Sequence, residues 1–200
     1  SIKRCIFTSK SDVIMTSGPH PSLVKAGKIA ATVMKGIKKD VTPKTKIYSI
    51  CSNVEKKIIE LGARPAFPCN VSIDHIAAHY TSPIGDSSVI PHSGLVKIDL
   101  GVHIDGYIVD MARTIDLDGT FEGFVVATDD ALQEAISQFT PGINLGDVGK
   151  TIEKIITTYG LRPIKNLTGH NIERWRLHAG KKVPNVKTRS LDVVEEGEVY

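Results

Sequence analysis

The sequence predicts an α/β protein of two pseudo-symmetric halves, and three observations carry that prediction. Residues 21–61 and 121–159 each contain two stretches in which apolar residues recur at helical spacing. A β-hairpin with an Asp-Gly turn follows the first helical pair, and a second β region follows the second pair. This repeated order is an approximate internal duplication, and we expect a functional site between the two halves.

The composition is that of an ordinary globular protein. The chain has 200 residues, 41% hydrophobic and 24% charged, which suits one domain with a real core. The net charge of +3 comes without any block of Lys or Arg, so no specific nucleic-acid binding is indicated. Three unpatterned cysteines favour a reducing compartment, and no apolar run approaches membrane-spanning length. We therefore expect a cytoplasmic monomer without a membrane segment.

The first half begins after a segment without sustained periodicity. Residues 1–20 are expected to form a strand or an irregular leader, and residues 21–200 one domain. Pro21 or Ser22 starts the first helix, which ends within residues 40–43. The second helix ends near Gly62, and its apolar stripe is Ile47, Ile50, Cys51, Val54, Ile58, Ile59 and Leu61.

The second half has two helices separated by Pro141-Gly142. They cover residues 121–139 and 143–159, and their expected inner faces are Ala131, Leu132, Ala135, Ile136, Val148, Ile152, Ile155 and Ile156. The run 193–200 is expected to begin a strand.

Asp105-Gly106 is the strongest turn signal in the chain. As a two-residue turn it pairs Gly101 with Asp110 and Asp99 with Ala112. Because side chains alternate along a strand, one face of the hairpin is apolar. That predicted core face comprises Ile98, Leu100, Val102, Ile104, Tyr107, Val109, Met111 and Ile115.

Asp99 and Asp110 share the opposite face as a diagonal pair, about 7–8 Å apart at Cα, and Gly101 beside them leaves space. Two carboxylates this close raise each other's pKa, and a divalent metal ion between them is the usual solution. A solvated outer face of an edge hairpin would show the same alternation, so this hairpin alone leaves both interpretations open.

Three histidines are candidates for chemistry. His79 follows Ala77-Ala78 and precedes Tyr80-Thr81, although a histidine beside a tyrosine is often a packed structural residue. His170 and His178 are an even number of residues apart, which would place them on one face of extended backbone. That spacing is no specific metal signature, and an ordinary surface strand would also explain it.

Taken together, these motifs resemble type II methionine aminopeptidases. The resemblance rests on Lys97-Ile98-Asp99 followed by Asp110, on Ala77-Ala78-His79-Tyr80-Thr81, and on Gly169-His170 followed by Leu177-His178-Ala179-Gly180. It covers nearly all of residues 21–200, and the archaeal branch is the most similar. The resemblance implies the pita-bread fold, an α/β architecture of two related halves.

The same resemblance implies the roles of individual residues. Asp99, Asp110 and His170 would bind two divalent metal ions (Co, Mn, Fe or Zn). His79 would hydrogen-bond the substrate, His178 would lie by its carbonyl, and Phe67 and Leu177 would line the methionine pocket. The implied activity is hydrolytic removal of the N-terminal methionine from nascent polypeptides, with transient ribosome association.

Two glutamates that complete the metal site in this family would lie after Tyr200. We therefore expect the pita-bread fold to lack its C-terminal part here, and this chain alone to be inactive. The main alternative is a non-catalytic pita-bread adaptor that binds the ribosome or RNA, although such proteins lose metal ligands that are present here. A prolidase or an aminopeptidase P is a third interpretation, with different residues expected around His79 and His178.

Overall fold

The computed structural model describes residues 18–200. The predicted N-terminal segment falls almost entirely on residues 1–17, which lie outside the described residues. The described chain divides into two compact units, Pro21–Glu122 and Gly123–Tyr200, and residues 18–20 are grouped with the second. None of the helices in residues 18–200 combines the length and the apolar character needed to cross a membrane.

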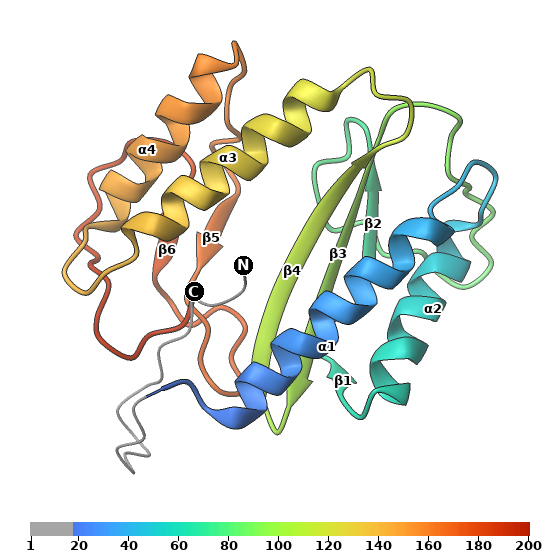
Figure 1. Ribbon diagram of the computed structural model, residues 1–200, viewed down its shortest axis with the longest axis horizontal. Coiled ribbons are helices and arrows are strands. Elements are labelled where there is room, and N and C mark those ends of the chain that lie inside the picture. Colours follow the sequence, from blue (N-terminus) through green and yellow to red (C-terminus); the bar gives the residue numbers. More distant parts are fainter. Residues whose placement is uncertain (1–17) are drawn as a thin grey trace. The chain divides into compact units, whose positions relative to one another are not determined.

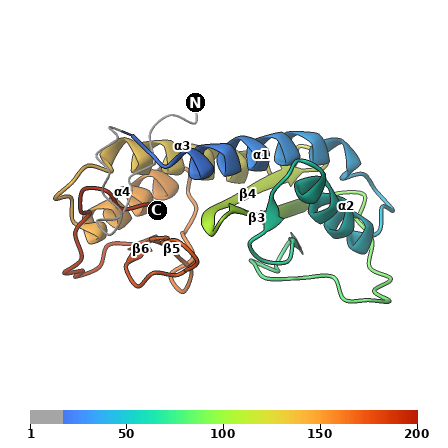
Figure 2. The same ribbon diagram turned by 90° about the horizontal axis from the view of Figure 1, so that it is seen from below.

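The N-terminal unit, Pro21–Glu122, packs two helices against one face of an antiparallel sheet (Figures 1 and 2). β3 is the central strand, because β4 pairs along one edge while β1 and β2 pair with successive parts of the other. The elements are α1 (Pro21–Ile37), the 3-10 helix η2 (Lys38–Asp40), α2 (Ile47–Glu60), β1 (Arg64–Pro65), β2 (Asn70–Ile73), β3 (Leu95–Ile104) and β4 (Tyr107–Asp116).

The β3–β4 hairpin has the predicted register. Gly101 pairs with Asp110 and Asp99 with Ala112 across the Asp105-Gly106 turn. Both turn residues have positive φ, +52° and +81°, as a type I′ turn requires. The predicted apolar face of β3 lies in the core with α1 and α2, whereas Ile59 of the predicted α2 stripe is 49% exposed on the other side of that helix. The core of this unit therefore forms on the predicted face of the hairpin.

The C-terminal unit repeats the order of two helices followed by strands. Its elements are α3 (Glu122–Gln138), α4 (Leu145–Thr158), β5 (Thr168–His170) and β6 (Lys182–Pro184). The buried face of α3 is made of alanines at four-residue spacing, Ala127, Ala131 and Ala135, while Leu132 is 49% exposed. The prediction of Leu132 as an inner residue was therefore wrong, because the helix turns its small side chains inward.

The run 193–200 is not a regular strand. It makes single bridges, from Val193 to Asn144 and from Val199 to Ile172. Lys181 forms ion pairs with this run: its Nζ lies 3.0 Å from Glu195 Oε1 and 2.7 Å from Glu198 Oε1. Charge pairing holds this segment where we expected a strand to begin.

Glycines in α4 let a neighbouring segment approach its backbone. A Cβ at Gly149 would lie 2.5 Å from the Val186 carbonyl oxygen and 2.8 Å from that of Pro184. The start of the helix is fixed to the same segment, because the Asn144 side chain accepts from Gly146 N at 2.8 Å and donates to the Ser190 carbonyl at 2.8 Å. These contacts hold the segment after β6 against α4.

We expect Gly149→Ala to lower the free energy of unfolding by about 1–3 kcal/mol, because the added methyl group would overlap the Val186 and Pro184 carbonyl oxygens and the Pro184 ring. The matched control is Gly36→Ala in α1, where a Cβ meets nothing within 4 Å, and which should raise that free energy by up to about 1 kcal/mol. Urea denaturation of both variants is the measurement. Stability changes of the same sign would contradict the close-approach explanation.

Candidate functional site

The predicted carboxylate pair is present on the sheet face of the N-terminal unit that faces away from α1 and α2. The register makes Asp99 on β3 and Asp110 on β4 diagonal neighbours. Burial raises the pKa of the Asp99 carboxyl above its usual range, and the charge of Asp110 raises it further. A half-buried carboxylate beside a second carboxylate gains strongly from a nearby cation.

The space beside the two aspartates is filled rather than open. Phe67 lies over Gly101, so close that a Cβ there would be 2.3 Å from Cε1 of the ring. The prediction that Gly101 leaves a gap between the carboxylates was therefore wrong, and its reason is that the glycine makes room for an aromatic ring. Phe67 therefore lies beside Gly101, which pairs with Asp110, and its part in lining a methionine pocket stays a prediction.

His79 lies near this pair in a backbone conformation that is uncommon for residues other than glycine. Its backbone has a φ of +67°, in the left-handed region that costs a non-glycine residue of order 1 kcal/mol. The side chain is exposed, and the charge of His79 is near enough to lower the pKa of Asp99. An exposed imidazole on a strained backbone argues against a packed structural histidine.

Several contacts fix the backbone around His79. Val71 N donates to the Tyr80 carbonyl at 2.8 Å, and Lys97 Nζ donates to the Ala77 carbonyl. Burial lowers the pKa of Lys97, while Asp99 raises it. The segment that carries His79 is therefore anchored on both sides to strands of the sheet.

Two polar residues at this site were not predicted. Asn70 Nδ2 donates to Asp99 Oδ2 at 3.3 Å, and Thr81 Oγ1 donates to Asn70 Oδ1. The side chain of Asn70 is on β2, directly opposite Asp99, and this residue is only 8% exposed. A strand register for residues 70–73 would have been needed to find this pair.

The C-terminal unit brings His170 and His178 together. Their rings are edge-on, with centroids 4.3 Å apart. The two rings do not meet because of their even spacing along extended backbone. The chain turns back at Glu173–Arg176, where Trp175 has a φ of +64°. After this turn, Ala179 N donates to the Asn171 carbonyl at 3.0 Å. Leu177 directly follows this turn and is half-buried. Its part in substrate binding stays a prediction.

The side chains of Asp99, Asp110 and His170 are of the chemical types that bind divalent cations. Within residues 18–200, no three histidine, cysteine, aspartate or glutamate side chains form a group that could hold a metal ion. Asp99 and Asp110 belong to the N-terminal unit and His170 belongs to the C-terminal unit. Carboxylate oxygens with an imidazole are a donor set that Co, Mn, Fe and Zn ions accept.

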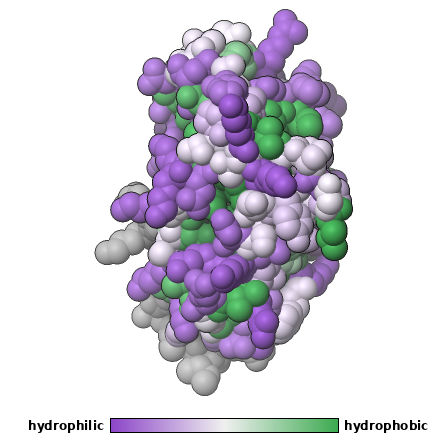
Figure 3. All heavy atoms as spheres, turned by 90° about the vertical axis from the view of Figure 1, so that its right-hand side faces the viewer, coloured by the Kyte–Doolittle hydropathy of each residue, from purple (hydrophilic) through white to green (hydrophobic). Residues whose placement is uncertain are grey.

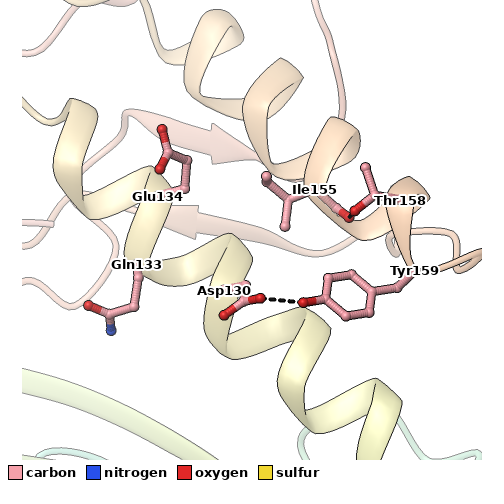
Figure 4. A pocket seen from close by; sticks show the side chains of 6 residues that line it. All are labelled: Asp130, Gln133, Glu134, Ile155, Thr158 and Tyr159. Carbon is pink, nitrogen blue, oxygen red and sulfur yellow. Dashed lines mark hydrogen bonds between the residues drawn. The ribbon is translucent and has the colours of Figure 1, made fainter.

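A pocket in the C-terminal unit lies elsewhere. It is formed between α3 and α4 and lined by Asp130, Gln133, Glu134, Ile155, Thr158 and Tyr159 (Figure 4). The Tyr159 hydroxyl donates to Asp130, and this hydrogen bond raises the pKa of the tyrosine. None of the predicted site residues lines this pocket, so we assign no part of the expected chemistry to it.

The Phe67–Gly101 contact leads to a prediction about substrate binding. For the activity that the resemblance implies, Gly101→Ala should displace the ring and raise KM for a methionine-terminated peptide by about 10-fold or more, since displacement of about 1 Å is costly at such sites. Combining it with Phe67→Leu should recover part of that loss, because the smaller side chain frees the space. Steady-state kinetics of the single and double variants is the measurement, and an unchanged KM in Gly101→Ala would contradict the prediction.

Relatives found by sequence are methionine aminopeptidases of archaea. The chain is 46% identical over 186 residues to that of Saccharolobus solfataricus, covering 93% of this chain and 62% of the relative. It is 46% identical over 184 residues to that of Methanothermobacter thermautotrophicus, covering 89% of this chain and 60% of the relative. The chain thus spans about 60% of the length of these curated relatives.

Solved structures and a family model agree with this. A methionine aminopeptidase from Thermotoga maritima is similar with a TM-score of 0.81 and 26% identity, covering 90% of this chain and 77% of that one. A prolidase from Pyrococcus horikoshii shares the fold with a TM-score of 0.77 and 23% identity, covering 96% of this chain and 53% of that one. The family model for "Metallopeptidase family M24" matches residues 22–200. The chain has the pita-bread fold and belongs to metallopeptidase family M24.

Proposed function

We propose that the protein is a methionyl aminopeptidase, a dinuclear metallo-exopeptidase that removes the N-terminal methionine from nascent polypeptides in the cytoplasm and acts as a monomer. The observation that carries the proposal is the diagonal pair of Asp99 and Asp110, with His79 exposed beside them. The archaeal relatives, named methionine aminopeptidases, support the substrate class. The retained carboxylates favour an enzyme over a non-catalytic adaptor of the same fold.

The proposed roles follow from what each side chain can do. Asp99 and Asp110 would hold two divalent ions together with His170, and the ions supply an activated water and polarise the scissile carbonyl. His79 would donate a hydrogen bond as negative charge develops on the substrate, and its exposed ring is free to reach it. His178 would lie by the peptide carbonyl, and Phe67 and Leu177 would contact the methionine side chain.

The test is methionine release from a Met-Ala-Ser peptide by the full-length protein, with any sequence that follows Tyr200, after loading with Co²⁺ or Mn²⁺; residues 1–200 alone are expected to be inactive. A peptide blocked by acetylation at its amine and an Ala-Pro peptide are the controls. We expect release from the free Met peptide only, its loss with a chelator, and its recovery when the metal is returned. Metal binding without any release would support the adaptor, and cleavage of the Ala-Pro peptide alone would support a prolidase-like or aminopeptidase P-like enzyme.

We also propose transient association with the ribosome through α1. Between Pro21 and Lys39 the chain has no acidic residue. The exposed residues Lys25, Lys28 and Lys35 lie on one face of α1 at steps of three and seven residues, and exposed Lys39 follows four residues later in η2. Among the described residues, none of these lysines has a carboxylate partner. Hydrophilic side chains also dominate much of the face on the side of α1 and α2 that Figure 3 shows. Such a stripe suits contacts to RNA phosphates that depend on salt and not on base sequence.

Sedimentation with ribosomes tests the association. Changing Lys25, Lys28 and Lys35 to Glu together should abolish co-sedimentation at low salt and leave peptide cleavage unchanged. The matched control changes Lys56 and Lys57 to Glu, because these lysines already lie near Glu60. Equal loss in both variants would mean that only net charge matters and would contradict a role for α1.

A further inference from the structure

The polar contacts around Asn70 form a chain that ends on Asp99. β2 and β3 pair so that Asn70 lies directly opposite Asp99, which places both side chains on the same face of the sheet. The backbone on either side of Asn70 is held, since Cys69 N donates to Glu55 Oε1 at 3.0 Å and Val71 N donates to the Tyr80 carbonyl at 2.8 Å. The amide of Asn70 is therefore presented to Asp99 from a fixed backbone.

The direction of the hydrogen bonds follows from the chemistry of the groups. An ionised carboxylate only accepts, so the Asn70 side chain must turn its NH₂ group toward Asp99 Oδ2. Its carbonyl oxygen then faces Thr81, whose hydroxyl must donate to it. Asp99 itself selects this amide orientation, because the opposite orientation would put two acceptors face to face, and the Thr81 hydroxyl then holds the amide in place by donating to its oxygen.

We propose that Asn70 and Thr81 are positioning residues that orient the Asp99 carboxylate for metal binding, an inference that rests on the proposed function. The amide occupies one carboxylate oxygen and leaves the other for a cation. Because Asn70 is neutral, it orients Asp99 without cancelling the negative charge that a cation needs. A lysine or arginine at this position would satisfy the same oxygen and compete with the metal.

The pair also joins the two parts of the site within the N-terminal unit. Thr81 is two residues after His79, in the segment that Val71 anchors through the Tyr80 carbonyl. One hydrogen-bonded chain, Thr81–Asn70–Asp99, therefore links the segment bearing His79 to the metal-binding strand. A change at Thr81 should act on Asp99 without touching the metal or the peptide.

The experiment uses Thr81→Val, which removes the hydroxyl and keeps the shape, and Thr81→Ser, which keeps the hydroxyl. Binding of Co²⁺ is measured by calorimetry and by the visible absorption spectrum of the bound ion, and Tm is recorded without metal. We expect Thr81→Val to weaken Co²⁺ binding about 10–100-fold and to change the spectrum. Thr81→Ser should restore both, and Tm should be similar in all three proteins.

Ser72→Ala is the matched control. Ser72 is the next residue on the same face of β2 and is buried, but it lies opposite Lys97 and not opposite Asp99, so its removal should leave Co²⁺ affinity unchanged. Wild-type Co²⁺ binding in Thr81→Val would overturn the inference, as would a loss that Ser does not rescue and that follows Tm. If the full-length wild-type protein binds Co²⁺ but releases no methionine, only the proposed function fails; if it binds no Co²⁺, both fail.

Discussion

Replacing Asp110 with asparagine is expected to abolish methionine release and to leave the fold intact. The loss should be about 10³-fold or more, beyond the 10–100-fold typical of a residue that only supports a metal ligand. Asparagine has nearly the shape of aspartate and Asp110 is exposed, so the β3–β4 pairing has no reason to change. Peptide turnover, Co²⁺ titration and thermal unfolding of the same preparation are the measurements.

Asp105→Asn is the control for that variant. It removes a carboxylate from the same hairpin at a turn position with a φ of +52°, and Asn-Gly forms this type of turn as well as Asp-Gly does. Activity in Asp105→Asn should therefore be close to that of the wild type. Full activity in Asp110→Asn would remove the assignment of the hairpin as a metal-binding element.

Loss of the His79 imidazole is expected to lower kcat by about 10²–10⁴-fold, the range for a positioned proton-transfer or hydrogen-bonding group. His79→Asn is a better substitution than alanine, because asparagine tolerates the left-handed backbone that this position adopts. The metal affinity should change little, which separates this variant from Asp110→Asn. Stopped assays at saturating peptide and metal measure kcat directly.

His79→Ala then serves as the companion variant. If backbone strain matters, alanine should lower Tm somewhat more than asparagine, while both lose activity equally. A lower Tm with unchanged turnover in both variants would show that His79 is a structural residue after all.

The sequence was most informative where structure is local. The Asp105-Gly106 turn and the alternation on both sides of it were enough to predict every pair from Asp99–Ala112 to Ile104–Tyr107. Helix positions were also predictable from spacing, but helix rotation was less so. Ile59 and Leu132 are apolar, yet both are about half exposed. Leu132 lies outside a buried face made of alanines, and Ile59 lies one residue beyond the buried row of Ile50, Val54 and Ile58.

The site was harder to predict wherever it depends on non-local pairing. Asn70 becomes part of the site only because β2 pairs with β3 and places it opposite Asp99. No turn residues in the sequence predict this pairing. Phe67 fills the space over Gly101 only because β1 and β2 lie along the same edge of β3. His170 and His178 come together through a tight turn in which Trp175 has a positive φ. Because tryptophan rarely adopts a positive φ, the sequence did not predict this turn.

The length of the Asp105-Gly106 turn has a consequence for how this protein can change during evolution. One inserted residue must be absorbed as a bulge, or it slips β4 by one position and turns Asp110 to the core face. Two residues inserted after Gly106 keep the faces, but a slide of β4 by roughly 7 Å would put Asp110 directly opposite Asp99 and replace the diagonal arrangement. Insertions and deletions among homologous chains are therefore expected to fall outside Leu95–Asp116, even where many of its exposed residues are freely exchanged.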